Sequence, residues 1–230
     1  MEAEGRRLFP SYGLLGMSFK LLVRFAAALC ITVLGLAGSA SGEPYKIVGF
    51  GDSLMAGYGL DAGLSFAEKL ENALREKGHD VVIVNAGVSG DTTSGGLSRL
   101  DWSVPDGTQL VILELGANDM LRGIEPQQTR QNLDTMITRL RQKNITVLLA
   151  GMLAAPNLGP DYQAAFDAIF PELAEKHGIE LYPFFLDGVA GQPTYQLKDG
   201  MHPNAAGIDI MVSRVLPTVE KLLAEAADPS

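Results

Sequence analysis

The chain contains five short runs that are almost continuously apolar. They are Tyr45–Gly51, Val81–Ala86, Leu110–Leu115, Thr146–Gly151 and Glu180–Phe184. Strands without apolar and polar alternation are typical of a parallel sheet that is covered on both faces. Because parallel strands need long crossover connections, usually helices, the runs predict an α/β architecture.

Segments with helical periodicity fill the intervals between the runs. We expect helices at Ser65–Lys77, Thr93–Leu100, Gln127–Lys143, Asp161–Lys176 and from Asn204 to Ala226. Ser65 with Glu68 matches a capping box, which marks a helix start. The alternation predicts a doubly wound, three-layer α/β sandwich. Since no linker rich in Pro, Gly or Ser interrupts it, we expect residues 41–230 to form one domain.

The first forty residues have the order of a secretory signal peptide. Lys20 and Arg24 precede an apolar stretch, 25–36, and the small residues 37–40 follow it. The apolar stretch is short for a membrane span. We therefore expect residues 1–40 to be a signal peptide, with Met17 as an alternative start, and an exported protein, periplasmic or secreted. After cleavage we expect no stable membrane insertion. A retained anchor, a twin-arginine signal at Arg6-Arg7 and a lipid-modified Cys30 are weaker matches.

Charge and cysteine content exclude several kinds of chemistry. The net charge is −9, and removal of residues 1–40, which carry +2, leaves −11. Nucleic-acid binding is disfavoured because phosphate contacts need Lys and Arg. Cys30 is the only cysteine and would leave with the signal peptide. The mature chain then has neither a disulfide, a thiolate nucleophile nor a cysteine metal ligand. No feature indicates an oligomeric state.

Polar, glycine-rich loops follow the predicted strands. Ser53 follows the first strand, residues 87–93 the second, residues 116–119 the third, and residues 199–204 come after the fifth. Open α/β sheets bind ligands at the edge formed by the carboxyl ends of their strands. The sequence therefore predicts a site in which these loops meet.

The residues in these loops have complementary chemistry. His202 can act as a general base for Ser53, and Asp199 can accept the other imidazole N–H and fix the tautomer. Gly90 can bring a backbone N–H close to a ligand, and the Asn118 amide is a neutral donor suited to a developing oxyanion. With the Ser53 N–H, these groups would supply three donors.

The four loop blocks resemble those of the SGNH or GDSL hydrolase superfamily. They are Gly51-Asp52-Ser53-Leu54, the glycine block ending at Gly90, Gly116-Ala117-Asn118-Asp119, and Asp199-Gly200-Met201-His202-Pro203. The similarity runs from about Ile47 to about Lys221 and is closest to the periplasmic branch of multifunctional thioesterases, arylesterases and lysophospholipases. It implies a flavodoxin-like sheet in the order 2-1-3-4-5 and no cofactor. It also implies a triad of Ser53, Asp199 and His202, with an oxyanion hole of Ser53, Gly90 and Asn118. Independently of the resemblance, we expect no metal site.

Other interpretations of these residues remain open on the sequence alone. Ser53 could cap the helix that follows the first strand, a common role for serine. Asp52, Asp91 and Asp119 could hold loop backbone or, less favourably, form a carboxylate metal cluster. The stretch around Ser53 is not a dinucleotide-binding fingerprint, because the third glycine is missing. It is not the Gly-x-Ser-x-Gly nucleophile elbow either, because Met55 occupies the position of the last glycine.

The loop after the fourth strand is the candidate for the substrate pocket. Leu153, Ala154, Ala155 and Pro156 are apolar and small enough to wall an acyl site, although a plain crossover loop explains them equally well. The prediction is a serine esterase or thioesterase for aryl esters, short to medium acyl esters, acyl thioesters or lysophospholipids. The alternatives are a carbohydrate O-acetyl esterase of the same superfamily, a non-catalytic lipid- or glycan-binding module, and a flavodoxin-like cofactor carrier.

Overall fold

The computed structural model describes residues 43–228 and contains five parallel strands in one sheet. The strands are β1 (Tyr45–Gly51), β2 (Val81–Gly87), β3 (Leu110–Glu114), β4 (Thr146–Ala150) and β5 (Glu180–Tyr182). Their order is β2-β1-β3-β4-β5, so both the α/β class and the strand order implied by the resemblance are confirmed. The predicted signal peptide, residues 1–40, lies outside the described residues.

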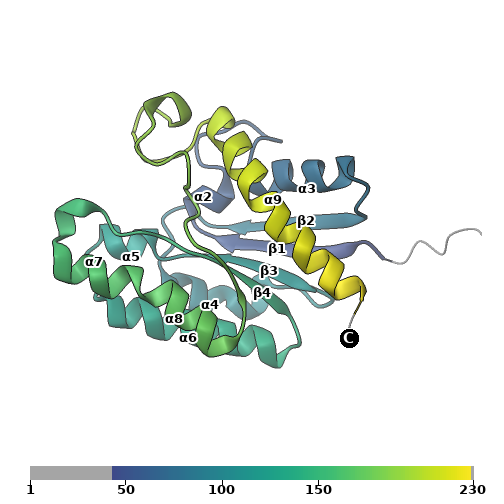
Figure 1. The fold of residues 1–230 in the computed structure, drawn as a ribbon, viewed down its shortest axis with the longest axis horizontal. Helices are drawn as coiled ribbons and strands as arrows, with labels where there is room; N and C mark the ends of the chain where they lie inside the picture. The colour runs from purple at the N-terminus through teal and green to yellow at the C-terminus, as the bar shows by residue number, and fades with distance from the viewer. Residues whose placement is uncertain (1–42, 229–230) are drawn as a thin grey trace, which may run out of the picture. The chain divides into compact units, whose positions relative to one another are not determined.

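Helices cover both faces of the sheet and make three layers (Figure 1). One face carries α3 (Phe66–Glu76) and α9 (Ala205–Ala227), which pack against each other. The other face carries α4 (Thr93–Ser103), α6 (Pro126–Gln142) and α8 (Ile169–His177). Within the described residues, no helix is both long enough and apolar enough to cross a membrane.

Burial along the strands follows their place in the sheet. All five residues of the central strand β3 are buried, whereas the edge strands β2 and β5 both contain partly exposed residues. On the helix side, Phe66, Leu70 and Leu74 of α3 are fully buried against the sheet. Continuous apolar runs thus correspond to strands with helices on both faces.

Several helices differ from their predicted bounds. The capping box of Ser65 and Glu68 starts α3 as expected. The single helix expected at Asp161–Lys176 is two helices, α7 (Pro160–Asp167) and α8. Pro171 has no N–H to donate to the Asp167 carbonyl four residues earlier, so the helical hydrogen-bond ladder is interrupted there.

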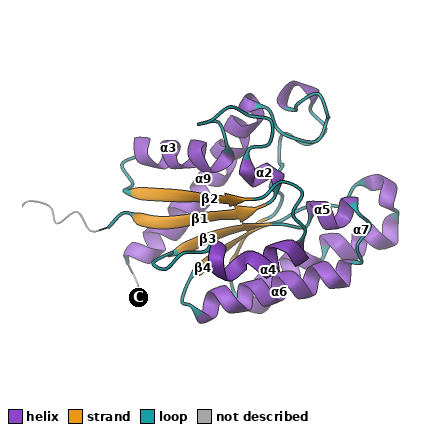
Figure 2. Cartoon of the chain, turned by 180° about the vertical axis from the view of Figure 1, so that it is seen from behind, coloured by secondary structure: helices purple, strands orange, loops and turns teal. Residues whose placement is uncertain are grey.

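Two short helices and two 3₁₀ turns lie outside the predicted set. The helices are α2 (Ser53–Ala56) and α5 (Ala117–Leu121), and the turns are η1 (Pro156–Leu158) and η2 (Pro193–Tyr195). The arrowheads of β1, β2 and β3 point toward α2 and α5 (Figure 2). Both short helices therefore lie at the carboxyl edge of the sheet, where the polar loops were expected.

Candidate active site

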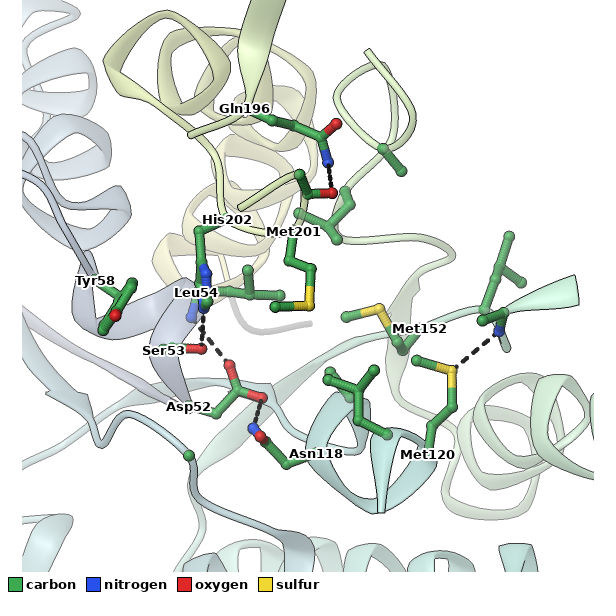
Figure 3. Close-up of a pocket in the computed structure, with 18 of the residues that line it drawn as sticks. Asp52, Ser53, Leu54, Tyr58, Asn118, Met120, Met152, Gln196, Met201 and His202 are labelled. Atoms are coloured by element: carbon green, nitrogen blue, oxygen red, sulfur yellow. Dashed lines mark hydrogen bonds between the residues drawn. The ribbon is translucent and has the colours of Figure 1, made fainter. Parts of the chain in front are cut away.

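The carboxyl edge of the sheet brings together Ser53, Gly90, Asn118 and His202, which line one cavity (Figure 3). Ser53 is the first residue of α2, directly after β1, and Asn118 lies in α5, directly after β3. Gly90 follows β2, and His202 comes from the segment before α9. The sequence predicted these residues in loops after the first, second, third and fifth strands, and the structure brings them together.

A continuous hydrogen-bonded chain joins the serine, histidine and aspartate. Nε2 of His202 lies 2.9 Å from Oγ of Ser53, and Nδ1 of His202 lies 2.7 Å from Oδ2 of Asp199. The other oxygen of Asp199 accepts backbone N–H groups from Met201 at 2.9 Å and from His202 at 3.0 Å. Led by the Met201 N–H, these donors lower the pKa of Asp199 to about 2. Asp199 is therefore an anion throughout the neutral range and holds the proton of His202 on Nδ1.

The helix cap at this turn is Asp52, not Ser53. Oδ1 of Asp52 accepts the Leu54 N–H at 3.0 Å, as an N-cap side chain does. The capping interpretation of Ser53 is therefore wrong, and the serine hydroxyl is left to bond His202.

The expected oxyanion donors are arranged around the same turn. Nδ2 of Asn118 donates one hydrogen bond to Oδ2 of Asp52 at 2.9 Å, which fixes the amide beside Ser53. Gly90 has φ = +81°, a left-handed conformation that favours glycine. Its carbonyl accepts a hydrogen bond from Nη2 of Arg122 at 2.6 Å. The glycine loop and the asparagine are thus each held by a side chain from outside their own loop.

Three other residues at this edge were not identified from the sequence. Glu114, at the end of β3, is fully buried behind Asp52, and its Oε2 accepts the Asp52 N–H at 3.2 Å. Arg99 of α4 pairs with Asp91 at 2.7 Å and donates to the Gly51 carbonyl at 2.9 Å. The ring of Tyr58 packs on the imidazole of His202, with ring centroids 4.5 Å apart and 37° between planes.

One sequence signal was available for Glu114, because it is the only charged residue inside an otherwise apolar run, Leu110–Leu115. A carboxyl group that the strand pattern buries needs a reason. Arg99 and Tyr58 gave no comparable signal, since a single Arg in a helix and a single Tyr near a turn are ordinary surface residues.

The cavity beside Ser53 has a volume of about 380 Å³ and mainly apolar walls. Leu153 and Ala155 from the loop after β4 line it, but Ala154 and Pro156 do not. Including those two in the predicted pocket was wrong. Ala154 is buried with its N–H bonded to Asp167 at 2.7 Å, and Pro156 is exposed at the start of η1. The sequence also missed most of the apolar lining, which includes Met120, Leu121, Met152, Phe184, Leu186 and Met201.

Comparison with known proteins places this geometry in a family. Residues 50–210 match the GDSL-like Lipase/Acylhydrolase family. The chain is 38% identical over 195 residues to the esterase TesA of Pseudomonas aeruginosa, which covers 84% of this chain and 96% of TesA. It is 39% identical over 186 residues to an arylesterase of Vibrio mimicus, which covers 79% of this chain and 90% of that protein.

Solved structures agree with these sequence matches. The SGNH-hydrolase family esterase AlinE4 has 50% sequence identity and a TM-score of 0.68, with 80% of this chain and 99% of that chain covered. The crystal structure of TesA has 39% identity and a TM-score of 0.73, with 77% and 99% covered. This protein belongs to the GDSL-like lipase and acylhydrolase family, the SGNH hydrolases, as its four sequence blocks predicted.

Proposed function

We propose that the protein hydrolyses acyl esters and thioesters through an acyl-enzyme formed on Ser53. The observation that carries the proposal is the uninterrupted chain from Ser53 through His202 to Asp199, with contacts of 2.9 and 2.7 Å. A serine hydroxyl is a weak nucleophile unless a base stands within hydrogen-bond distance, and here one does. Each member has one role: Ser53 is the nucleophile, His202 the general base and Asp199 the group that orients the base.

The reaction proceeds in two symmetrical halves. Nε2 of His202 takes the Oγ proton while Ser53 attacks the acyl carbon, and Asp199 stabilises the imidazolium. The tetrahedral intermediate collapses when the imidazolium gives that proton to the leaving alcohol or thiol. Water then enters, loses a proton to His202 and attacks the acyl carbon. As this second tetrahedral intermediate collapses, the imidazolium gives its proton to Oγ of Ser53 and the carboxylic acid is released.

Three donors are available for the negative charge on the carbonyl oxygen. Ser53 is the first residue of α2, so its N–H has no acceptor within the helix. The Gly90 N–H donates to no acceptor within residues 43–228. Asn118 uses one amide hydrogen on Asp52 and has a second that can face the cavity. Preorganised donors of this kind usually supply the largest single contribution to catalysis.

The walls of the cavity favour an apolar acyl group. The large apolar side chains of the lining are four leucines, three methionines and Phe184, and among the described lining residues none is Lys or Arg. The cavity therefore suits aryl esters, short to medium acyl esters, the acyl part of thioesters, and lysophospholipids. The printed names of the relatives agree, including a thioesterase 1/protease 1/lysophospholipase L1 of Escherichia coli that is 35% identical over 189 residues. A sugar O-acetyl esterase is less well supported, because a glycan needs more polar groups than this lining offers.

We further propose that residues 1–40 are an export signal and that residues 41–230 are the single hydrolase domain. The order of charged, apolar and small residues supports this division. The protein would then act in the periplasm or outside the cell. N-terminal sequencing of the protein recovered from those compartments tests it: a start near residue 41 supports cleavage, and a start at residue 1 or 17 contradicts it.

Turnover of p-nitrophenyl esters from acetyl to palmitoyl, beside an acyl-CoA and a lysophospholipid, tests the activity. Ser53→Ala should lower turnover of every substrate by several orders of magnitude and leave only the residual catalysis that the oxyanion donors and substrate binding provide. Ser98→Ala is a matched control, because the exposed Ser98 hydroxyl bonds only the Gly95 carbonyl. Comparable turnover by the two variants would refute Ser53 as the nucleophile.

A further inference from the structure

Two carboxyl groups are buried side by side directly behind the nucleophile, and the proposed mechanism uses neither. Asp52 and Glu114 each have 0% exposure. Oε1 of Glu114 is the one buried side-chain polar atom without a hydrogen-bond partner among the described residues. A buried ionised carboxyl without partners is costly, and two adjacent carboxylates are costlier still. This pair therefore requires an explanation.

Asp52 connects the nucleophile turn to the oxyanion donor. Its Oδ1 accepts the Leu54 N–H at 3.0 Å, on the far side of Ser53, and its Oδ2 accepts the Asn118 amide at 2.9 Å (Figure 3). Because both oxygens accept from N–H donors, the ionised form of Asp52 satisfies this geometry. A protonated Asp52 would place an O–H against one of those donors.

Glu114 is placed where it can stay neutral. Its Oε2 accepts the Asp52 N–H at 3.2 Å, while Oε1 has no donor. The carboxyl lies against Gly51, where an added Cβ would crowd both Oε2 and the backbone carbonyl of Glu114. Glu114 therefore has one N–H donor, whereas Asp52 has two. The ionised form of Glu114 is less stabilised by hydrogen bonds than the ionised form of Asp52.

The surrounding charges do not supply a counter-ion for both groups. The charge of His202 lowers the pKa of Asp52, and the charge of Asp91 raises it. The charged group that acts on Glu114 is Asp52 itself, which raises the pKa of Glu114. Arg99 is nearby, but its guanidinium bonds Asp91 and the Gly51 and Ala86 carbonyls and packs on Phe50. It makes no hydrogen bond to either buried carboxyl.

These environments separate the two ionisations. Burial, followed by the negative charge of Asp52, raises the pKa of Glu114 well above its usual range. Burial also raises the pKa of Asp52, but the Leu54 and Asn118 hydrogen bonds oppose it and leave the value at about 6. Of the two groups, Asp52 therefore ionises first, and Glu114 keeps its proton to higher pH.

We propose that Asp52 and Glu114 hold one proton between them, that Glu114 carries it during turnover, and that the Asp52 carboxylate is the positioning residue for Asn118. The inference rests on the proposed function, since Asn118 matters only if an oxyanion forms beside Ser53. Asp52 does not touch the substrate. It acts by fixing the amide plane of Asn118, so that the second N–H is presented to the cavity.

A double-mutant cycle in kcat tests whether Asp52 acts through Asn118. Asp52→Asn keeps the shape of the side chain, but its amide N–H₂ would point at one of the two groups that donate to Asp52, the Leu54 N–H or the Asn118 amide. We expect it to lower kcat by about 10²- to 10³-fold, as loss of an oxyanion donor does, with little change in KM. Asn118→Ala should give a similar loss, and the double variant should be no slower than the worse single variant by more than about threefold.

Controls separate this outcome from a folding defect. Asp106→Asn makes the same chemical change at an exposed aspartate, and each variant should keep the wild-type circular dichroism spectrum. Losses that multiply in the double variant would show that Asp52 does not act through Asn118, and would overturn the proposal. Ser53→Ala with wild-type turnover would instead refute the proposed function.

NMR of the unsubstituted protein tests the protonation states without any variant. With ¹³C-labelled carboxyls and ¹⁵N-labelled asparagine, Glu114 should remain protonated at about pH 7.5, above its ordinary ionisation range. The Asn118 side-chain amide resonances should shift together with the Asp52 carboxyl, near its pKa of about 6. The inference would be overturned if Glu114 is ionised at neutral pH, or if the Asn118 amide resonances do not shift as Asp52 titrates.

Discussion

Replacing Asn118 with alanine removes one of the three proposed oxyanion donors and should slow the acylation and deacylation steps. Loss of one such donor typically lowers kcat by about 10²- to 10³-fold, or about 2.7–4 kcal/mol of transition-state stabilisation. KM should change little, because the cavity that holds the acyl group is formed by other side chains. The expected signature is therefore a loss in kcat alone.

The same substitution has a second, separately measurable effect. Oδ2 of Asp52 accepts its hydrogen bond from Asn118, and Asp52 is fully buried. Leaving this acceptor without a donor should lower the free energy of unfolding by about 1–3 kcal/mol. The pKa of Asp52 should also rise above its value of about 6, since the Asn118 hydrogen bond is one of the groups that lower it.

Steady-state hydrolysis of p-nitrophenyl butyrate gives kcat and KM, and urea titration gives the free energy of unfolding. Asn72→Ala serves as the control, because it removes an exposed asparagine from the middle of α3. An Asn118→Ala enzyme with near-native kcat would remove Asn118 from the mechanism. A loss seen only in KM would assign it to ground-state binding instead.

Three further substitutions test the surroundings of the site. The raised pKa of Glu114 contributes stability that is fully present below its ordinary value of 4.5 and is lost as the pH rises toward the pKa of the folded protein. The free energy of unfolding of Glu114→Gln should therefore increase relative to the wild type by up to about 1.4 kcal/mol per pH unit in that window. A difference in urea titrations that does not change with pH would contradict the raised pKa. Arg99→Met leaves the nearly buried Asp91 without its ion-pair partner and should lower the free energy of unfolding by about 3–5 kcal/mol, measured by thermal and urea unfolding. A loss of less than about 1 kcal/mol, as for an exposed ion pair, would contradict this prediction. Tyr58→Leu should lower kcat about two- to fivefold by removing the aromatic face on which His202 packs, whereas Tyr58→Phe should not; equal effects of both would assign the role to the hydroxyl.

The sheet was predictable from the sequence because its strands are buried on both faces. β1 and β3 read as continuous apolar runs, and their bounds agree with the prediction to within a residue. The strand order itself came from the family resemblance, since apolar runs alone do not determine which strands are neighbours. The break between α7 and α8 carried a signal in Pro171, which the helical periodicity of the surrounding residues obscured.

The residues of the candidate site were predictable because glycine-rich blocks with chemically complementary side chains follow β1, β2 and β3 and precede α9. Ser53, Gly90, Asn118 and His202 line one cavity, and Asp199 bonds His202. Which residue capped α2 was not predictable, because Asp52 and Ser53 are adjacent and both are good N-cap residues. Only the geometry of the turn decides which side chain reaches the Leu54 N–H.

The cavity was the least predictable part. Its walls come from loops whose side-chain directions depend on tertiary contacts rather than on periodicity. Ala154 is buried and its N–H bonds Asp167, whereas its neighbours Leu153 and Ala155 line the cavity. Met152 and Met201 contribute to the lining from two different loops, and no local sequence pattern relates them.

Covalent labelling tests directly whether the Ser53 hydroxyl is the nucleophile of an acyl hydrolase. The most direct measurement is peptide mapping by mass spectrometry after the unsubstituted protein has reacted with an alkyl organophosphonate. One equivalent of phosphonate should be covalently attached, and the modified residue should be Ser53, with esterase activity lost in proportion to labelling. Stoichiometric inactivation with the adduct on any other residue, or full labelling with activity retained, would contradict the account.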